Sequence, residues 1–305
     1  MKPSDQKLAD QFDERLGTFA EDMPGFALQE TKSTFIRQLV DSTHRTKYID
    51  LMKQRGISPL RADPRNLIFD PVLAAIYLYA QGDLEEACWL VFLSVHFGKH
   101  RTTGWTLTRR IYGRLDSGQI SSWERTSQDF DEFAKWLESR KEQVKKGPPP
   151  AGFGNHRKYE SLSESNGRGT PASVRTYIEW VQKFGSHQEM FLAAAKSNEG
   201  NPAKAFDFLY NDMAVASFGR LAKFDYLSMI GKIGIASIKA GSTYVQGATG
   251  PLKGAEIVFG KGPGPAGLDK KLASLAFHLD VTMQDMEDAV CNWQKNPKKY
   301  ERFKG

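Results

Sequence analysis

The sequence predicts an all-α fold, and three observations lead to this prediction. Residues that cap helices recur along the chain, often with proline at the first helical position. Apolar residues then return at intervals of three and four, which places them on one face of a helix. Strand-like alternation of polar and apolar residues is nearly absent.

The first two clear helices follow one another directly. Asp70 caps the first, which ends at Gly82. Asp83 and Glu86 have the spacing of a capping box, and the segment Ala87–Val95 that follows is apolar on every side. We therefore expect this second helix to be buried and to pair with the first in antiparallel fashion.

Later helices are predicted from the same starting signals. They begin at Thr170-Pro171, at Ser186, at Asn201-Pro202 and at Thr282, where Asp285 completes a second capping-box pattern.

A stretch rich in glycine, proline, serine and basic residues interrupts this pattern at 141–171. We interpret it as a long loop or linker between an N-terminal helical lobe, 1–140, and a second helical lobe, 172–305. Whether the lobes are separate domains stays open. In a bilobal enzyme, the cleft between lobes is the natural substrate site.

The bulk composition indicates a globular protein with a polyanionic partner. The chain has 305 residues, of which 40% are hydrophobic and 26% charged, and its formal charge is +6. Thirteen Lys or Arg stand against eight Asp or Glu from Arg220 to Gly305, and five basic residues with no acid lie between Val91 and Leu115. Local basic segments favour a nucleic acid, although a solvated basic face gives the same pattern. The polar start and the lack of a long apolar run predict a cytoplasmic protein without a membrane partner. Cys88 and Cys291 are expected to be free thiols.

The glycine-rich segment Tyr244–Phe259 is the first candidate site. Its two glycines, three residues apart, predict a tight turn between two short helices, a helix-hairpin-helix at about 242–260. Backbone N–H groups of such a turn can hold a phosphate of DNA, although a plain helix-helix turn needs no ligand. The predicted DNA-binding residues are Gly247, Ala248, Thr249, Gly250, Lys253, Lys261 and Lys270.

Asp269 is the predicted catalytic residue. It follows a Gly/Pro-rich loop and is expected to open an amphipathic helix at 269–279, where first-turn N–H groups stabilise a carboxylate. A fixed carboxylate beside a DNA-binding turn can stabilise an oxocarbenium-like centre and orient water during cleavage of a glycosidic bond. The alternative is a purely structural N-cap.

Together, the hairpin, its Gly/Pro-rich loop and Asp269 resemble the signature of the helix-hairpin-helix DNA glycosylase superfamily. The match covers about 242–279, but the hairpin has one residue more than the usual form and lacks its first proline. Lyase members carry a lysine where this chain has Leu252, with Lys253 one place later. The resemblance thus implies a monofunctional hydrolase, and Lys253 as a Schiff-base amine stays an alternative.

Over a longer span the chain resembles the α-glutamyl/putrescinyl thymine pyrophosphorylase family, clade 3. The residues that carry this resemblance are His96-Phe-Gly-Lys-His100, Gly104-Trp105, Phe218–Tyr226, Gly247–Gly254 and Cys291–Lys295. It implies double-stranded DNA with hypermodified pyrimidines, such as phage DNA, as partner, and removal of such bases as antiviral defence.

Further side chains are predicted to line a pocket or contact DNA, because basic and aromatic residues together suit phosphate binding and base stacking. They are His96, Lys99, His100, Trp105, Arg220, Lys223, Asp225 and Tyr226. A structural Arg220–Asp225 pair is the plain alternative. We predict no metal site and no cofactor, and leave open only a monovalent cation at the hairpin.

The sequence therefore predicts a DNA glycosylase that flips out a modified pyrimidine and excises it with Asp269, leaving an abasic site. Two alternatives remain. One is a transferase that displaces pyrophosphate from an activated thymine, and the other is a DNA-binding module without catalytic activity. No protein partner is predicted.

Overall fold

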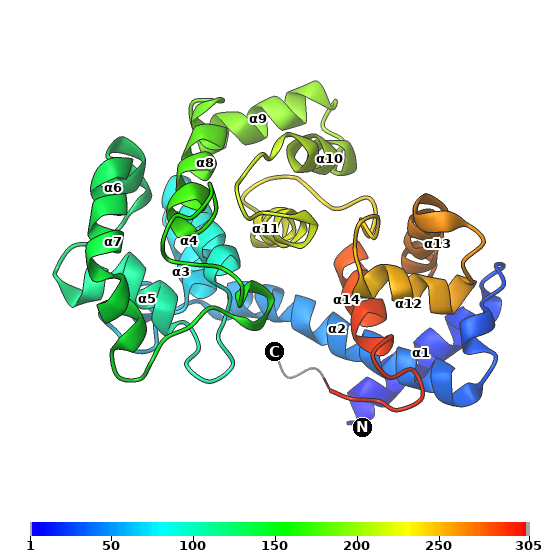
Figure 1. Ribbon diagram of the computed structural model, residues 1–305. Coiled ribbons are helices and arrows are strands. Elements are labelled where there is room, and N and C mark those ends of the chain that lie inside the picture. The colour runs from blue at the N-terminus through cyan, green and yellow to red at the C-terminus, as the bar shows by residue number, and fades with distance from the viewer. Residues whose placement is uncertain (1, 303–305) are drawn as a thin grey trace. The chain divides into compact units, whose positions relative to one another are not determined.

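The computed structural model describes residues 2–302 and confirms the all-α fold. Fourteen α-helices and four short 3-10 helices form the described chain, and no β-strand occurs within it (Figure 1). The α-helices are α1 (Pro3–Thr18), α2 (Gln29–Arg55), α3 (Pro71–Ala80), α4 (Leu84–Phe97), α5 (Thr106–Tyr112), α6 (Trp123–Gln128), α7 (Phe130–Lys146), α8 (Thr170–Gln182), α9 (His187–Ser197), α10 (Pro202–Asp212), α11 (Arg220–Ile233), α12 (Gly250–Phe259), α13 (Gly264–Leu279) and α14 (Met283–Trp293).

Side-chain caps begin the helices where the sequence predicted them. Asp70 accepts hydrogen bonds from two first-turn N–H groups of α3, and Ser186 and Asn201 cap α9 and α10 in the same way. The Thr282–Asp285 capping box of α14 forms in both directions. Asp83 caps α4, but the Glu86 carboxylate turns inward and leaves the other half of that box unformed. These helix starts are confirmed because short-range hydrogen bonds determine them.

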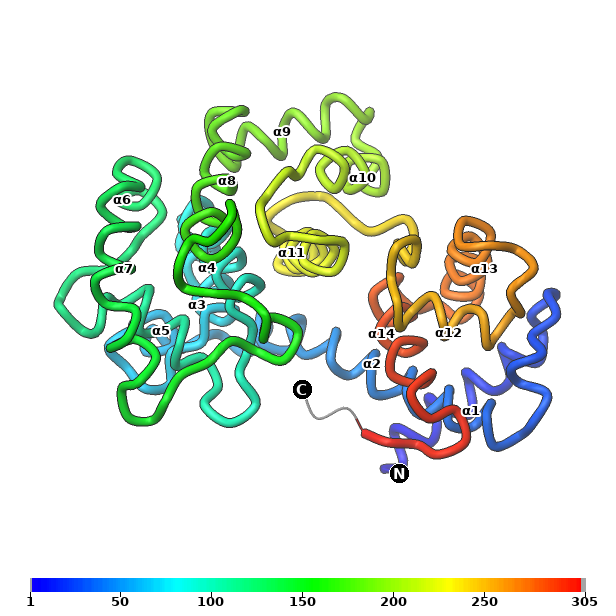
Figure 2. Tube along the Cα trace, in the orientation of Figure 1, coloured from blue at the N-terminus to red at the C-terminus, as the bar shows by residue number. Residues whose placement is uncertain are grey.

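The chain divides into two compact units with an unexpected membership. Unit 1 combines residues 2–51 with 240–302, and unit 2 comprises 52–239. α1, all but the last turn of α2 (both blue) and the last three helices (orange to red) thus belong to one unit, whereas Figure 2 traces unit 2 from cyan to yellow. This division does not follow the expected lobes, 1–140 and 172–305. The stretch 141–171 is an internal part of unit 2 rather than a boundary.

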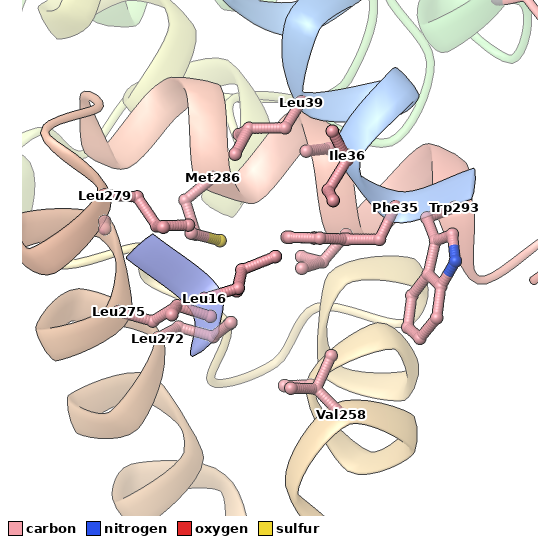
Figure 3. Close-up of a cluster of buried hydrophobic side chains, with 14 of the residues drawn as sticks. Leu16, Phe35, Ile36, Leu39, Val258, Leu272, Leu275, Leu279, Met286 and Trp293 are labelled. Atoms are coloured by element: carbon pink, nitrogen blue, oxygen red, sulfur yellow. The ribbon is translucent and has the colours of Figure 1, made fainter. Parts of the chain in front are cut away.

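Unit 1 is built around one apolar cluster (Figure 3). Phe35 and Trp293 pack edge to face with their ring centroids 5.6 Å apart, and the Trp293 indole N–H donates to the Thr31 carbonyl oxygen at 3.1 Å. The labelled residues of the cluster are Leu16, Phe35, Ile36, Leu39, Val258, Leu272, Leu275, Leu279, Met286 and Trp293. These side chains come from α1, α2, α12, α13 and α14, so segments from both ends of the chain form one core.

Glycines allow α12 to lie close to its neighbours in unit 1. A Cβ on Gly254 would lie 2.5 Å from the Val290 carbonyl oxygen of α14. One on Gly25 would lie 2.3 Å from the Ile257 carbonyl oxygen of α12. Both distances are below van der Waals contact, so only glycine permits this packing.

Unit 2 surrounds α4, which is buried along almost its whole length as predicted. The Tyr177 hydroxyl lies 2.7 Å from Nε2 of His187 and 2.9 Å from the Tyr226 hydroxyl, and all three side chains are fully buried. Close by, both oxygens of Glu86 accept hydrogen bonds, from the Tyr112 hydroxyl and the Trp123 backbone N–H. Unit 2 thus encloses a polar network whose groups largely satisfy one another.

No helix in the described part of the chain is long and apolar enough to cross a membrane.

Candidate functional site

The turn around Gly247 follows an irregular segment rather than a helix. After α11 ends at Ile233, residues 234–249 form bends and turns, so the first helix of the motif predicted at about 242–260 is absent. Tyr244 has a left-handed φ of 51°, and its N–H donates to the Ser242 hydroxyl oxygen at 3.0 Å. This local bond replaces a helical one, which accounts for the difference.

The turn itself forms as expected of a glycine-rich segment. Gly247 has a φ of 74° and is exposed, and the Ala248 N–H donates to the Val245 carbonyl oxygen at 2.9 Å. Ala248 is buried, whereas Thr249 is exposed and leads directly into α12. The turn therefore presents Gly247 and Thr249 to solvent at a helix N-terminus.

Two helices joined by a short glycine-rich loop do occur, but the loop follows α12 instead of preceding it. Gly260–Pro263 connects α12 to α13, and both Gly260 and Gly264 have positive φ. The Gly264 N–H donates to the Lys261 carbonyl oxygen at 3.2 Å, which closes the loop into a turn. The helical hairpin of unit 1 is therefore α12–α13. The sequence predicted its connecting turn before α12, whereas the structure has it after α12.

Asp269 lies inside α13 rather than at its start. The helix begins at Gly264, because Pro265 suits the first helical turn and the Gly/Pro-rich run enters the helix. The prediction that Asp269 opens a helix at 269–279 is therefore wrong.

The Asp269 carboxylate is almost fully covered, with 9% of the residue exposed. One oxygen accepts from the Ser242 hydroxyl at 2.5 Å. The other accepts from the Thr243 hydroxyl at 2.6 Å and from the Val245 N–H at 3.3 Å. Asp269 thus fastens α13 to the segment that precedes the Gly247 turn.

The starts of α12 and α13 have features that suit an anion. Neither helix has a side-chain cap or an acidic residue in its first turn. The Gly264 N–H is used within its turn and Pro265 has no N–H, so at the start of α13 the N–H groups of Ala266 and Gly267 are the ones that an external acceptor could use. Lys253 in the first turn of α12 is exposed, as are Lys261 just before α13 and Lys270 within it. Lys271, in contrast, is engaged in an ion pair with Glu21.

His96 lies in the core of unit 2. The centroid of its ring lies 5.8 Å from that of Phe92 and 6.3 Å from that of Phe218, and its Nε2 lies 2.9 Å from the Thr170 hydroxyl oxygen. Burial, and to a lesser degree the positive charge of Arg157, lowers the pKa of His96 to about 3. The His96 ring is a neutral core group and does not reach the surface. It therefore does not make the predicted contact with DNA.

Lys99, His100 and Trp105 lie together on a surface turn. The backbones of His100 and Gly104 form a two-way bridge, and the His100 ring nitrogen Nδ1 accepts from the Thr103 N–H at 3.1 Å. The Lys99 ammonium lies 6.0 Å from the Trp105 ring centroid. Lys99 is exposed and His100 and Trp105 are half-buried, so these predicted contact residues are available to a ligand of unit 2.

The predicted residues of α11 divide between surface and core. Arg220 and Lys223 are half-buried. Arg220 lies near the ring of Phe224, and Lys223 lies near the ring of Tyr210. Burial lowers the pKa of Lys223. Tyr226 is fully buried and belongs to the network of Tyr177, so its ring is not available for stacking on a base.

One comparison with known proteins identifies the family. The family model of alpha-glutamyl/putrescinyl thymine pyrophosphorylase clade 3 matches residues 30–305. The chain belongs to this family. The resemblance stated from the sequence is thereby confirmed, whereas placement in the glycosylase superfamily stays a prediction. No curated protein and no solved structure matches the chain.

In this clade 3 pyrophosphorylase-family protein, Arg157 was not among the side chains that the sequence predicted to line a pocket or contact DNA. Its Nε donates to the Val95 carbonyl oxygen at 2.8 Å, and its guanidinium lies 5.9 Å from the Phe218 ring centroid. Burial lowers the pKa of Arg157, while the negative charges of Asp225 and Glu160 oppose that shift. The negative charge of Asp225 therefore acts on an arginine of the 141–171 stretch. The basic run Asn155–Lys158 was the only local signal, because its glycine-rich surroundings are typical of a linker.

Proposed function

We propose that this protein acts on thymine bases of DNA and replaces a pyrophosphate group on an activated thymine with an amine. The family description, which names a pyrophosphorylase together with α-glutamyl and putrescinyl thymine, supports this reaction class. It favours the transferase alternative over the glycosylase reading that the hairpin suggested.

The reaction places specific demands on the protein. The amine nitrogen attacks the exocyclic carbon at position 5 of the base, and a C–N bond forms while the C–O bond to pyrophosphate breaks. Pyrophosphate leaves with the electron pair, and the new ammonium group gives up a proton to solvent or to a basic side chain. The step balances without a redox partner, and its main requirement is stabilisation of a polyanionic leaving group.

The start of α13 is the observation that carries the proposal. It combines the first-turn N–H groups of Ala266 and Gly267, a glycine-rich loop that allows close approach, and the exposed Lys261 just before the helix, with the exposed Lys270 further along α13. Such an arrangement suits a phosphate or pyrophosphate better than a neutral base.

Double-stranded DNA is the proposed substrate. The exocyclic carbon at position 5 of a paired thymine projects into the major groove, and flipping the nucleotide would bring the whole base into contact with the enzyme. The exposed turn at Gly247 and Lys253 would contact the sugar-phosphate backbone. Phage DNA, which can carry hypermodified pyrimidines, is the source we propose to test first.

The test uses a DNA duplex whose thymine methyl carbon carries a pyrophosphate ester, with glutamate or putrescine as amine. Pyrophosphate release and the mass of the modified nucleoside are measured together. We expect the Lys261→Gln, Lys270→Gln double variant to lose most of its turnover. A Lys196→Gln variant, which changes an exposed lysine on α9 of unit 2, should retain it. Absence of both products with the wild-type protein would refute the proposal.

Base excision is the second candidate, favoured by one observation. Asp269 is held in a fixed orientation next to the exposed Gly247 turn, as a stabilising carboxylate requires. Both of its oxygens are already engaged, so excision would require it to release Ser242. Alkali-labile abasic sites in DNA carrying modified pyrimidines would identify this activity, because the transferase leaves no such sites.

A further inference from the structure

Residues 295–302 form a basic segment that we call the basic strap. Its exposed side chains include Lys295, Lys298, Lys299 and Arg302, against the single acid Glu301. The strap follows α14 and runs along α2 within unit 1 (Figure 1, red).

The strap is fixed to α2 at three points. The Thr34 hydroxyl donates to the Pro297 carbonyl oxygen, and the Gln38 side-chain amide donates to the Glu301 carbonyl oxygen at 2.7 Å. The Tyr300 hydroxyl donates to the Asp41 carboxylate. The anchors at 34, 38 and 41 recur at intervals of four and three, so one face of α2 holds the whole segment.

Tyr300 is the side chain that organises the middle of the strap. The guanidinium carbon of Arg37, an exposed α2 residue, lies 4.8 Å from the Tyr300 ring centroid. Burial and the contact with Asp41 raise the pKa of Tyr300 to about 12, so its hydroxyl remains a donor. The ring thereby brings the cation of Arg37 to the strap.

This attachment distinguishes the strap from a solvated basic tail. A free tail loses conformational entropy whenever it binds, whereas the backbone of the strap is already ordered. Glu301 is the only acid within the strap itself. Lys298 lies 3.8 Å from Glu30, but both side chains are more than half exposed, so this pair is weak. Lys295 donates to the Asn292 side-chain oxygen at 2.9 Å.

We propose that the basic strap is a preorganised binding surface for the sugar-phosphate backbone of DNA. The proposal rests on the proposed function in one respect, namely that DNA is the substrate. It adds a second phosphate-binding surface, on α2 and the strap, to the one at the starts of α12 and α13. Because these lysines lie outside the reacting groups, they should govern DNA affinity rather than the chemical step.

The first test separates charge from other effects. DNA binding of a Lys295→Gln, Lys298→Gln, Lys299→Gln triple variant is measured by fluorescence anisotropy over a range of salt concentrations. If each lysine contacts one phosphate, the slope of log affinity against log salt should fall in magnitude by roughly 3 relative to wild type. The matched control changes Lys145, Lys146 and Lys196, three exposed lysines of unit 2, to glutamine and should leave the slope nearly unchanged.

The second test separates preorganisation from charge. Tyr300→Phe removes the bond to Asp41 but keeps every cation of the strap. We expect DNA affinity to fall by about two- to tenfold while the salt slope stays at the wild-type value. Thermal unfolding of each variant shows whether the unit remains folded.

The outcomes bear on the two proposals separately. If the triple variant and its control have the same salt slope as wild type, the strap proposal is wrong, although wild-type turnover can still support the proposed function. If the wild-type protein does not bind DNA at all, both proposals fail. Loss of turnover in the triple variant at saturating DNA would also contradict the strap proposal, because a backbone contact acts on affinity.

Discussion

The Thr243 hydroxyl donates a hydrogen bond to the Asp269 carboxylate at 2.6 Å, and this contact joins α13 to the segment before the Gly247 turn. With Ser242 and the Val245 N–H as further donors, the carboxylate organises the loop from which the predicted DNA-binding turn emerges.

Removing this carboxylate should destabilise unit 1. Asp269→Ala removes the acceptor that three donors share in a largely buried setting, so we expect the free energy of unfolding to fall by about 3 kcal/mol, as measured by urea denaturation. Asp50→Ala, a change at an exposed aspartate of α2 in the same unit, serves as control. A variant of wild-type stability that has lost all turnover would instead indicate a catalytic role for Asp269.

Gly254 should tolerate no larger residue. The Cβ of Gly254→Ala would meet the backbone of α14 at Val290, and backbone atoms cannot move aside cheaply. We expect a loss of at least about 2 kcal/mol in the free energy of unfolding. Gly262→Ala is the matched control, because a Cβ at that position would have no heavy atom within 4 Å and the φ of Gly262 is not in the left-handed region. Equal stability of the two variants would contradict the close packing.

Glu86 should make stability depend on pH. Burial raises its pKa from 4.5 to about 7, so the folded protein holds one proton more than the unfolded chain between these values. The contribution of Glu86 to the free energy of unfolding therefore falls as pH rises from 4.5 to 7, and the loss is complete above that range. Between pH 5 and pH 8 the wild type should lose on the order of 3 kcal/mol relative to Glu86→Gln. Glu179→Gln, a change at an exposed residue of α8, should show no such difference.

The hydroxyl of Tyr177 should contribute to the stability of unit 2. Tyr177→Phe leaves His187 and Tyr226 without a shared buried partner, and we expect a loss of about 1 to 3 kcal/mol in thermal or chemical unfolding. Tyr159→Phe makes the same chemical change at a side chain that is 89% exposed and should be neutral. Comparable losses in both variants would mean that the buried hydrogen bonds of Tyr177 make no particular contribution to the free energy of unfolding.

Local signals explain what could be predicted from the sequence. The starts of α3, α9, α10 and α14 depend on caps within three residues, and these bonds can be recognised in the sequence without knowledge of the fold. The all-round burial of α4 followed from its composition in the same way.

Other features depend on contacts that the sequence does not display. The Gly/Pro-rich run before Asp269 suggested a loop, yet Pro265 fits the first turn of α13 and shifts the aspartate into the helix. The capping-box spacing at Asp83 and Glu86 gave no indication that Tyr112 would draw Glu86 into the core. His96 and Tyr226 looked like contact residues because their burial is decided by distant segments, including α8 and the 141–171 stretch.

The shared core of unit 1 also affects the order in which the protein can mature during synthesis. The apolar faces of α1 and α2 leave the ribosome long before α12–α14 have been translated. Phe35 therefore cannot pack against Trp293 until α14 has been made. Unit 2 is contiguous and can fold during that interval. Until then the nascent chain exposes the apolar faces of α1 and α2, and such exposed surfaces are prone to aggregate.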